Sequence, residues 1–167
     1  MKIYIAFLVE GLTEIEAARR KYDYLSGKVP LHLTLVFPLD VDNYEEDALT
    51  EFFSRYTAEK VSLSGVTGSL DNLVFLTLTR GNDFVIEIHN RLYNEFFSRS
   101  FDTSHTFFPH LTVGRCNNRR EMLDAINDIG QITLDSINLN TLAVIQICEG
   151  GERKILSKFK LCTVANA

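Results

Sequence analysis

The sequence predicts an α+β fold in which two pseudo-symmetric lobes, rich in antiparallel strands, flank one central cleft. First, the order strand, helix, strand, helix, strand occurs twice along the 167 residues. Second, each copy carries a His-x-Thr motif in its second strand, at His32 and at His110. Third, helical segments are few and strands recur in hairpin-like pairs, which favours this class over a doubly wound parallel sheet.

The first copy opens with an apolar segment at residues 2–9, which we expect to be a buried strand. Residues 11–25 are rich in helix-forming Glu, Ala and Arg, and Gly27 suits the end of a helix. A second strand is expected over residues 31–37, closed by Pro38.

A second helix is expected over residues 44–57, where apolar side chains recur at helical spacing after the N-cap candidates Asp42 and Asn43. Strands are predicted at residues 61–66 and 73–78, joined by a turn rich in Gly, Ser, Asp and Asn.

The second half predicts a helix over residues 84–97, a polar and aromatic loop over 98–108, a strand over 110–114 and a helix over 119–129. Two or three further strands complete the chain.

Length and composition indicate one domain spanning residues 1–167. With 46% hydrophobic residues the chain can bury one sizeable core, but it is too short for two independent domains. We therefore expect two pseudo-repeat lobes of approximately residues 1–70 and 71–167, between which strands can be exchanged.

The charge argues against a protein that holds long nucleic acids. A formal net charge of -5 and a pI near 5.4 do not supply the broad basic surface which that mode requires. A small nucleotide or one RNA end remains compatible with this charge, and we expect a monomer.

The cysteines and the N-terminal segment bear on the compartment. Cys116, Cys148 and Cys162 lack CxxC spacing, which indicates neither a disulfide framework nor a zinc ribbon. The apolar run at the N-terminus is interrupted by Glu10, is too short for a membrane span and lacks a small-residue cleavage site. We therefore expect a cytoplasmic protein without membrane contact.

Two histidines stand in nearly the same surroundings, in the segments PLHLTL and PHLTV. Because side chains alternate across a strand, His32 and Thr34 face one side while their apolar neighbours face the other. The same holds for His110 and Thr112. Each strand thus anchors one face in the core and offers two polar groups on the other.

Paired histidines and threonines suit the cleavage of a phosphodiester. In-line attack needs one group that takes a proton from the nucleophile and another that gives a proton to the leaving oxygen. Histidine titrates at about pH 6.5, so two histidines can share these roles near neutral pH. Threonine hydroxyls can donate to the non-bridging oxygens. This chemistry requires no metal and no other cofactor.

Two other kinds of site compete for these residues. A zinc site would need further ligands, yet Asp40 and Asp42 lie beyond the end of the first motif strand and no acidic residue accompanies the second. A cysteine nucleophile near His110 would be Cys116, which nothing in the sequence marks as an activated thiolate. We therefore expect no metal site and no thiol catalysis.

Paired HxTx motifs about half a chain apart resemble those of the 2H phosphoesterase superfamily, whose bacterial members were first named 2′-5′ RNA ligases. The resemblance spans nearly the whole chain. It implies the fold of that superfamily, in which each lobe contributes one motif strand to the cleft. It also implies a metal-independent phosphodiesterase that opens 2′,3′-cyclic phosphates at the ends of RNA or on nucleotides.

Carried over residue by residue, the resemblance places His32 as the proton donor and His110 as the proton acceptor, with Thr34 and Thr112 at the phosphate. Arg115 stands where an arginine often follows the second motif in this family. Strict alternation would turn Arg115 away from the His110 face. We expect it to reach the phosphate only if the strand ends or twists near the preceding glycine.

The loop before the second motif contains residues whose role the sequence leaves open. Phe101, Phe107 and Phe108 could stack on a base or be buried, and His105 is equally ambiguous. The substrate is open between a 2′,3′-cyclic phosphate, a 2′,5′-linkage and another small diester such as an ADP-ribose cyclic phosphate. A non-catalytic RNA or nucleotide-binding module is a further alternative, although histidines in both motifs favour an enzyme.

Overall fold

The computed structural model describes residues 1–101, 104, 106–132, 134 and 136–163. The strands are β1 (Lys2–Leu8), β2 (His32–Asp40), β3 (Glu59–Gly68), β4 (Leu73–Arg80), β5 (His110–Arg115), β6 (Ile137–Leu139), β7 (Thr141–Ile147) and β8 (Arg153–Lys160). The α-helices are α1 (Thr13–Tyr22), α2 (Glu46–Ser54), α3 (Asn82–Phe96) and α4 (Arg119–Gly130). Short 3-10 helices cover Ser98–Ser100 and Glu149–Gly151.

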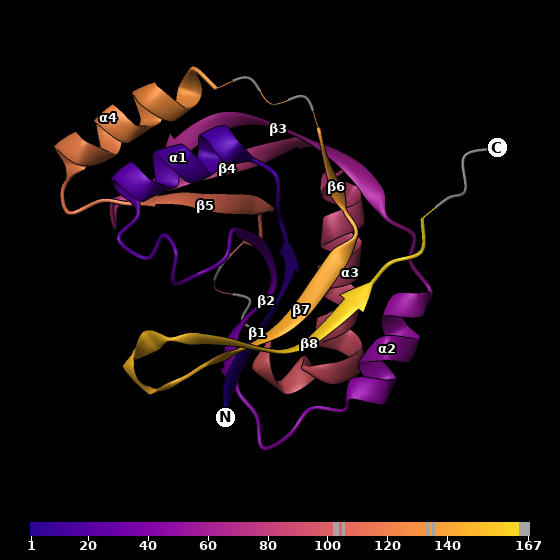
Figure 1. Ribbon diagram of the computed structural model, residues 1–167. Helices are drawn as coiled ribbons and strands as arrows, with labels where there is room; N and C mark the ends of the chain where they lie inside the picture. Colours follow the sequence, from indigo (N-terminus) through magenta and orange to yellow (C-terminus); the bar gives the residue numbers. More distant parts are fainter. Residues whose placement is uncertain (102–103, 105, 133, 135, 164–167) are drawn as a thin grey trace.

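The strands form one curled antiparallel sheet in the order β6-β3-β4-β5-β2-β1-β7-β8 (Figure 1). This order is symmetric about its middle, because β4 stands beside β5 as β1 stands beside β2. The ladder between β2 and β5 pairs Leu33 with Leu111. The two motif strands are therefore neighbours at the centre of the sheet, and the α+β class predicted from the sequence is confirmed.

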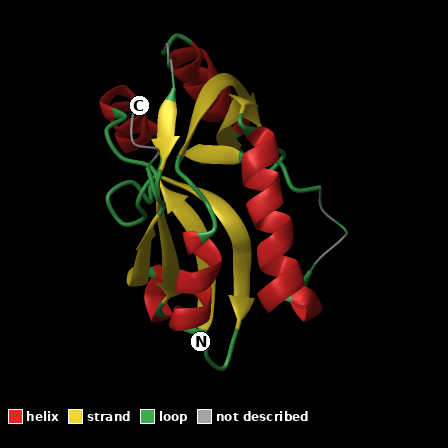
Figure 2. Ribbon diagram, turned by 90° about the vertical axis from the view of Figure 1, so that its right-hand side faces the viewer, coloured by secondary structure: helices red, strands yellow, loops and turns green. Residues whose placement is uncertain are grey.

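The helices cover the two halves of the sheet in pairs. α1 and α4 contact each other and β5, whereas α3 packs on β2 and α2 contacts β8 (Figures 1 and 2). The buried face of α3 includes Val85, Ile88 and Leu92, which follow helical spacing. Burying each such side chain stabilises the fold by about 1.5 to 3 kcal/mol. The core thus lies between the sheet and its helices and leaves the motif side chains on the other face.

Each half of the sheet draws strands from both sides of residue 70. The half β6-β3-β4-β5 takes β3 from before residue 70, and the half β2-β1-β7-β8 takes β7 and β8 from the end of the chain. The halves of the sheet therefore exchange strands instead of separating at the middle of the sequence.

The predicted end of the second strand is wrong, because β2 continues through Pro38 to Asp40. The ladder between β2 and β1 is irregular opposite the segment from Ile3 to Ile5. Proline has no N–H to donate and is tolerated where a ladder is already interrupted. The strand therefore accommodates Pro38 at an irregular point of this ladder.

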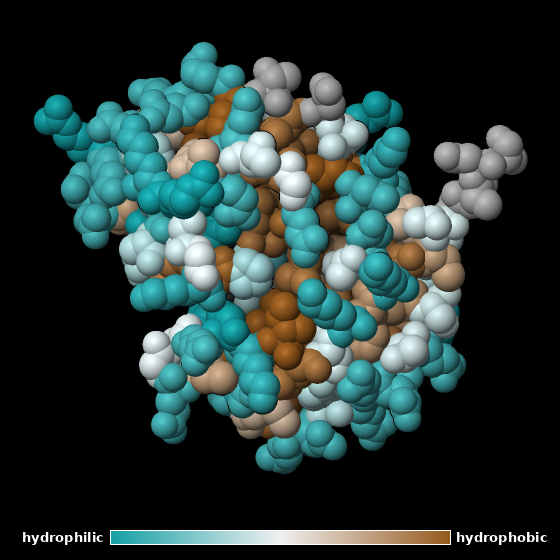
Figure 3. Space-filling model, viewed as in Figure 1, coloured by the Kyte–Doolittle hydropathy of each residue, from teal (hydrophilic) through white to brown (hydrophobic). Residues whose placement is uncertain are grey.

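No helix in the described part of the chain combines the length and the apolar character needed to cross a membrane. The three cysteines are unpaired. The face drawn in Figure 3 is largely hydrophilic, with apolar residues visible along its middle.

α1 ends at Tyr22, earlier than predicted, because the next residue enters a buried ion cluster. The carboxylate of Asp23 accepts hydrogen bonds from Arg19 Nη2 at 3.1 Å and from Arg115 Nη1 at 2.6 Å. The side chains of Arg19 and Asp23 are 2% and 0% exposed. Guanidinium groups taken out of water need a counter-ion. Asp23 supplies it and thereby ties the end of α1 to β5.

We expect Asp23→Asn to lower the free energy of unfolding by about 3 kcal/mol or more, because it removes the buried carboxylate that two largely buried guanidinium groups share. Urea unfolding monitored by circular dichroism measures the loss. The matched control is Glu16→Gln, which also removes a carboxylate from Arg19. Glu16 is 37% exposed and 3.5 Å from Arg19, so this variant should lose less than about 1 kcal/mol. Equal losses in the two variants would contradict the structural role of Asp23.

Candidate active site

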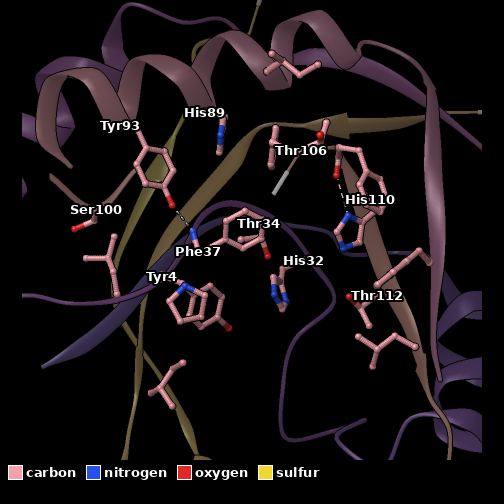
Figure 4. Close-up of a pocket in the computed structure, with 18 of the residues that line it drawn as sticks. Tyr4, His32, Thr34, Phe37, His89, Tyr93, Ser100, Thr106, His110 and Thr112 are labelled. Carbon is pink, nitrogen blue, oxygen red and sulfur yellow. Dashed lines mark hydrogen bonds between the residues drawn. The ribbon is translucent and has the colours of Figure 1, made fainter. Parts of the chain in front are cut away.

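A cleft of about 1020 Å³ opens on the face of the sheet opposite the main core. Its volume is in the range of small-molecule sites, which are usually about 300 to 1,000 Å³. All five site residues predicted from the sequence line it: His32, Thr34, His110, Thr112 and Arg115. Figure 4 shows the two histidines on neighbouring strands, each with its threonine nearby.

The strand pleat explains why the motif side chains meet in this cleft. Leu33 and Leu111 are fully buried and paired across the two strands. Side chains on either side of them point to the opposite face, where His32 and His110 are partly exposed. One pair of buried leucines thus brings the two motifs to a common space.

Each histidine ring is fixed by the same local hydrogen bond. Nδ1 of His32 lies 2.7 Å from the carbonyl oxygen of Pro30, and Nδ1 of His110 lies 2.9 Å from that of Phe108. A carbonyl oxygen only accepts, so Nδ1 carries the proton in both rings. Nε2 is then the nitrogen that bears the lone pair in the neutral ring, and it is free to exchange a proton with a ligand.

Burial keeps both rings neutral. Burial is the main cause that lowers the pKa of His32 from 6.5 to about 4, and the positive charges of Arg115, Arg19 and Arg153 lower it further. The hydrogen bond to Pro30 acts in the opposite direction. Burial also lowers the pKa of His110, where no nearby cation adds to the effect. Both imidazoles are therefore neutral at pH 7 in the free protein.

Aromatic rings from the adjoining strands pack against both histidines. The ring centroid of Tyr4 in β1 is 5.2 Å from that of His32, and the centroid of Phe75 in β4 is 4.3 Å from that of His110. β1 and β4 hold equivalent places in the sheet. The pseudo-symmetry of the fold thus extends to the contacts that restrict the two imidazoles.

A bulge in β5 turns Arg115 into the cleft. Thr112 pairs with Phe75 and Gly114 with Val74, so β5 has one residue more than β4 between these positions. The extra residue reverses the alternation beyond it. Arg115 therefore lies on the same face as Thr112, which meets the condition that the sequence analysis set for Arg115 to reach the phosphate. Its Nη1 atom remains bonded to Asp23.

The two threonine hydroxyls are available to a ligand. Thr34 and Thr112 are partly exposed and line the cleft. Neither hydroxyl forms a hydrogen bond with another residue in the described part of the chain. Each can donate its proton to an oxygen atom that enters the space between the histidines.

Aromatic residues gather at the end of the cleft near α3. The rings of His89 and Phe107 are stacked, with centroids 3.7 Å apart, and Phe37 packs edge-on against Phe107. Phe101 and Phe108 are 47% and 43% exposed, and both line the cleft. Phe107 is therefore stacked within the protein, whereas Phe101 and Phe108 remain accessible in part, Phe108 with its ring centroid 4.5 Å from that of His110. His105 lies outside the described residues.

Sequence reasoning missed further residues that line the cleft, among them Tyr4, Phe37, His89 and Arg153. A signal was available for Phe37, which follows Thr34 by three positions as Arg115 follows Thr112. No comparable pattern marks Tyr4, His89 or Arg153, which come from β1, α3 and β8. Among the described residues, no three His, Cys, Asp or Glu side chains are grouped as metal ligands.

A symmetric antiparallel sheet with one HxT strand from each half at a shared cleft defines the fold class of the 2H phosphoesterases. The chain belongs to the 2′-5′ RNA ligase superfamily, whose family model matches residues 8–146. This match confirms the resemblance that the two motifs indicated.

Two Geobacillus proteins are similar in sequence. One, from Geobacillus thermodenitrificans (strain NG80-2), is named "Putative phosphoesterase" and is 26% identical over 103 residues, which are 58% of this chain and 58% of that protein. Another protein of that designation, from Geobacillus sp. (strain WCH70), is 24% identical over 126 residues, which are 72% and 69% of the two chains. The match thus spans less than two thirds of the first relative.

Solved structures share the whole fold. A phosphoesterase crystal structure aligns with a TM-score of 0.61 at 19% identity and covers 96% of this chain and 98% of its own. The structure of E. coli LigT complexed with NADP+ aligns with a TM-score of 0.61 at 20% identity over 96% and 97% of the two chains. LigT complexed with 3′-AMP gives 0.60 at 18% identity over the same shares. These likenesses establish the fold.

We expect the His32 ring to titrate with a pKa of about 4, and His110 with a pKa below 6.5, in an NMR titration of the imidazole signals. In the unfolded chain His32 takes up a proton near pH 6.5, whereas in the native protein it is protonated only near pH 4. The free energy of unfolding should therefore fall as the pH drops through this window.

The variant His32→Asn assigns the signal and serves as the control for stability. It should reduce the loss of stability between pH 6.5 and 4 by about 2 kcal/mol, after allowance for the partial exposure of the ring. A His32 midpoint at or above 6.5 would show that the cleft does not disfavour the imidazolium.

Proposed function

We propose that this protein is a metal-independent phosphodiesterase that opens the 2′,3′-cyclic phosphate of an RNA end or a nucleotide by two-histidine acid/base catalysis. One observation carries the proposal: the two HxT motifs line one cleft, and in each motif the Nδ1 hydrogen bond leaves the Nε2 atom free. Two positioned proton carriers and two free hydroxyls suit a single phosphate between them.

In the proposed reaction, water attacks the phosphorus atom of the cyclic ester. One histidine takes a proton from the water as its oxygen bonds to phosphorus, and the bond from phosphorus to one ribose oxygen breaks. The other histidine gives a proton to that oxygen. Thr34 and Thr112 donate hydrogen bonds to the non-bridging oxygens, where Arg115 adds a positive charge.

The charges around His32 favour the reverse of the acid and base assignment that the resemblance implies. After burial, three arginines oppose its protonation, whereas burial alone lowers the pKa of His110. Both rings are neutral at pH 7, but the ring whose imidazolium is opposed by nearby arginines is the less suited to carry the proton that a donor must give. We therefore propose His32 as the acceptor and His110 as the donor, which takes up its proton as the anionic phosphate raises its pKa.

The aromatic end of the cleft supports a nucleotide as the substrate. The exposed rings of Phe101 and Phe108 can stack on a base in a sequence-tolerant way, at about 1 to 3 kcal/mol for each stacked base. The related fold of E. coli LigT has been solved with 3′-AMP and with NADP+. A small diester without a base would leave these rings unused.

The family name favours a second candidate, in which the same site acts on a 2′,5′-phosphodiester linkage. The proton transfers and the phosphate contacts would be the same. Hydrolysis and ligation are opposite directions of one reaction, and hydrolysis dominates in water.

The proposal is tested by turnover of three substrates in the presence of EDTA: adenosine 2′,3′-cyclic phosphate, a 2′,5′-linked diadenosine monophosphate and a cyclic phosphate without a base. We expect the cyclic nucleotide to be opened fastest, with no loss of rate to the chelator. Product analysis by ³¹P NMR shows which ribose oxygen keeps the phosphate. Binding without turnover of any substrate would indicate a binding module, and loss of rate on chelation would indicate a metal enzyme.

The four motif residues should differ in their effect on kcat. His32→Ala or His110→Ala removes a proton carrier and should lower kcat by about 10² to 10⁴. Thr34→Val or Thr112→Val removes one hydrogen bond to a charged group and should lower kcat by about 10- to 10³-fold. In the pH profile of kcat/KM, the His32 variant should lose the acidic limb.

The control for the threonine variants is Thr67→Val, an exposed strand residue in β3 outside the cleft lining, which should leave kcat unchanged. If a histidine variant keeps the wild-type kcat, the replaced histidine has no part in proton transfer. Loss of the alkaline limb in the His32 variant would restore the assignment implied by the resemblance.

A further inference from the structure

The charge of the cleft is opposite to that of the chain. The protein has a net charge of -5, yet the described lining of the cleft contains two arginines, Arg115 and Arg153, and no aspartate or glutamate. The positive charge of Arg115 is matched by Asp23 at 2.6 Å. Arg153 has no carboxylate within ion-pair distance in the described part of the chain. One lining cation is therefore left without a counter-ion.

Arg153 is held at the edge of the cleft by the hairpin that joins β7 to β8. It is the first residue of β8, stands opposite Ile147 of β7 and is partly buried. Its Nη1 atom donates a hydrogen bond to the carbonyl oxygen of Gly151 at 2.5 Å. A guanidinium carries five N–H groups, and its planar shape suits the oxygens of a phosphate.

The hydroxyl of Tyr4 lies in the same part of the cleft, on the side of Arg153. Tyr4 is 3% exposed, lines the cleft and packs beside His32 (Figure 4). Among the described residues, its hydroxyl forms no hydrogen bond of ordinary length and angle. Burial raises the pKa of Tyr4, and Arg153 opposes this rise through its charge and through a short-range interaction between the two side chains, ahead of the charge of Arg115. The guanidinium of Arg153 is thus close to the Tyr4 hydroxyl.

We propose that Arg153 and the Tyr4 hydroxyl form a second phosphate subsite, next to His32, for a further phosphate group on the same substrate. This inference rests on the proposed function and extends it, since the substrate becomes a nucleotide with two phosphate groups. The second group is either the 5′-phosphate of a mononucleotide or the phosphodiester to the preceding nucleotide of an RNA end. When the flexible side chain of Arg153 shifts toward the second phosphate group, the Tyr4 hydroxyl also contacts this group.

The test compares substrates that differ by the second phosphate at constant ionic strength. Adenosine 2′,3′-cyclic phosphate is compared with the same compound carrying a 5′-phosphate, and with a diadenosine that ends in the cyclic phosphate. We expect wild-type kcat/KM to be at least tenfold higher for one or both compounds with the second phosphate. The compound with the larger gain identifies the source of that phosphate.

Variants separate a phosphate contact from a structural role. Arg153→Gln should abolish the preference, because it should lower kcat/KM for the compounds with the second phosphate at least tenfold more than for the plain cyclic nucleotide. Tyr4→Phe should reduce the preference severalfold. The matched control Lys154→Gln removes an exposed neighbouring cation of β8 that does not line the cleft, and it should keep the preference. No preference in the wild type, or a preference that survives Arg153→Gln, would overturn the subsite.

Calorimetry with non-reacting ligands distinguishes failure of the subsite from failure of the proposed function. Adenosine 3′,5′-bisphosphate should bind at least tenfold more tightly than 3′-AMP, and Arg153→Gln should remove the difference. If no cyclic phosphate is opened but this difference is found, the proposed reaction fails and the subsite stands. Equal affinities overturn the subsite, whatever the protein hydrolyses.

Discussion

The pairing of Leu33 with Leu111 joins the halves of the sheet, and the position of every motif side chain follows from it. Each leucine is fully buried, and in each strand a histidine and a threonine flank it. A slip of one residue would turn one motif into the core and bury its imidazole. The apolar pairing therefore determines that both motifs face one cleft.

The described lining of the cleft differs in charge from the chain as a whole. An acidic chain concentrates arginines there, so that an anion is attracted while an imidazolium is disfavoured. A bound phosphate offsets the charge of the arginines and makes protonation of a neighbouring histidine easier. Substrate binding and readiness for acid catalysis are thus linked by the same charges.

The sequence predicted the two motif strands, because a repeated pattern of alternating polar and apolar residues reports the strand and its buried face together. It left Arg115 undecided, since the bulge that turns this residue inward is a property of the ladder with β4. The sequence did not predict Tyr4 and Arg153 as residues of the cleft, for a related reason. They come from opposite ends of the chain and meet only because β7 and β8 return to lie beside β1.

The central claim is that both motifs hold one phosphate, and a crystal structure with a vanadate complex of a ribonucleoside tests it most directly. We predict one vanadium centre contacted by Nε2 of His32 on one side and Nε2 of His110 on the other, with both threonine hydroxyls on its non-bridging oxygens. Two separate anions, each at its own motif, or a single anion contacted by one histidine alone, would contradict the account.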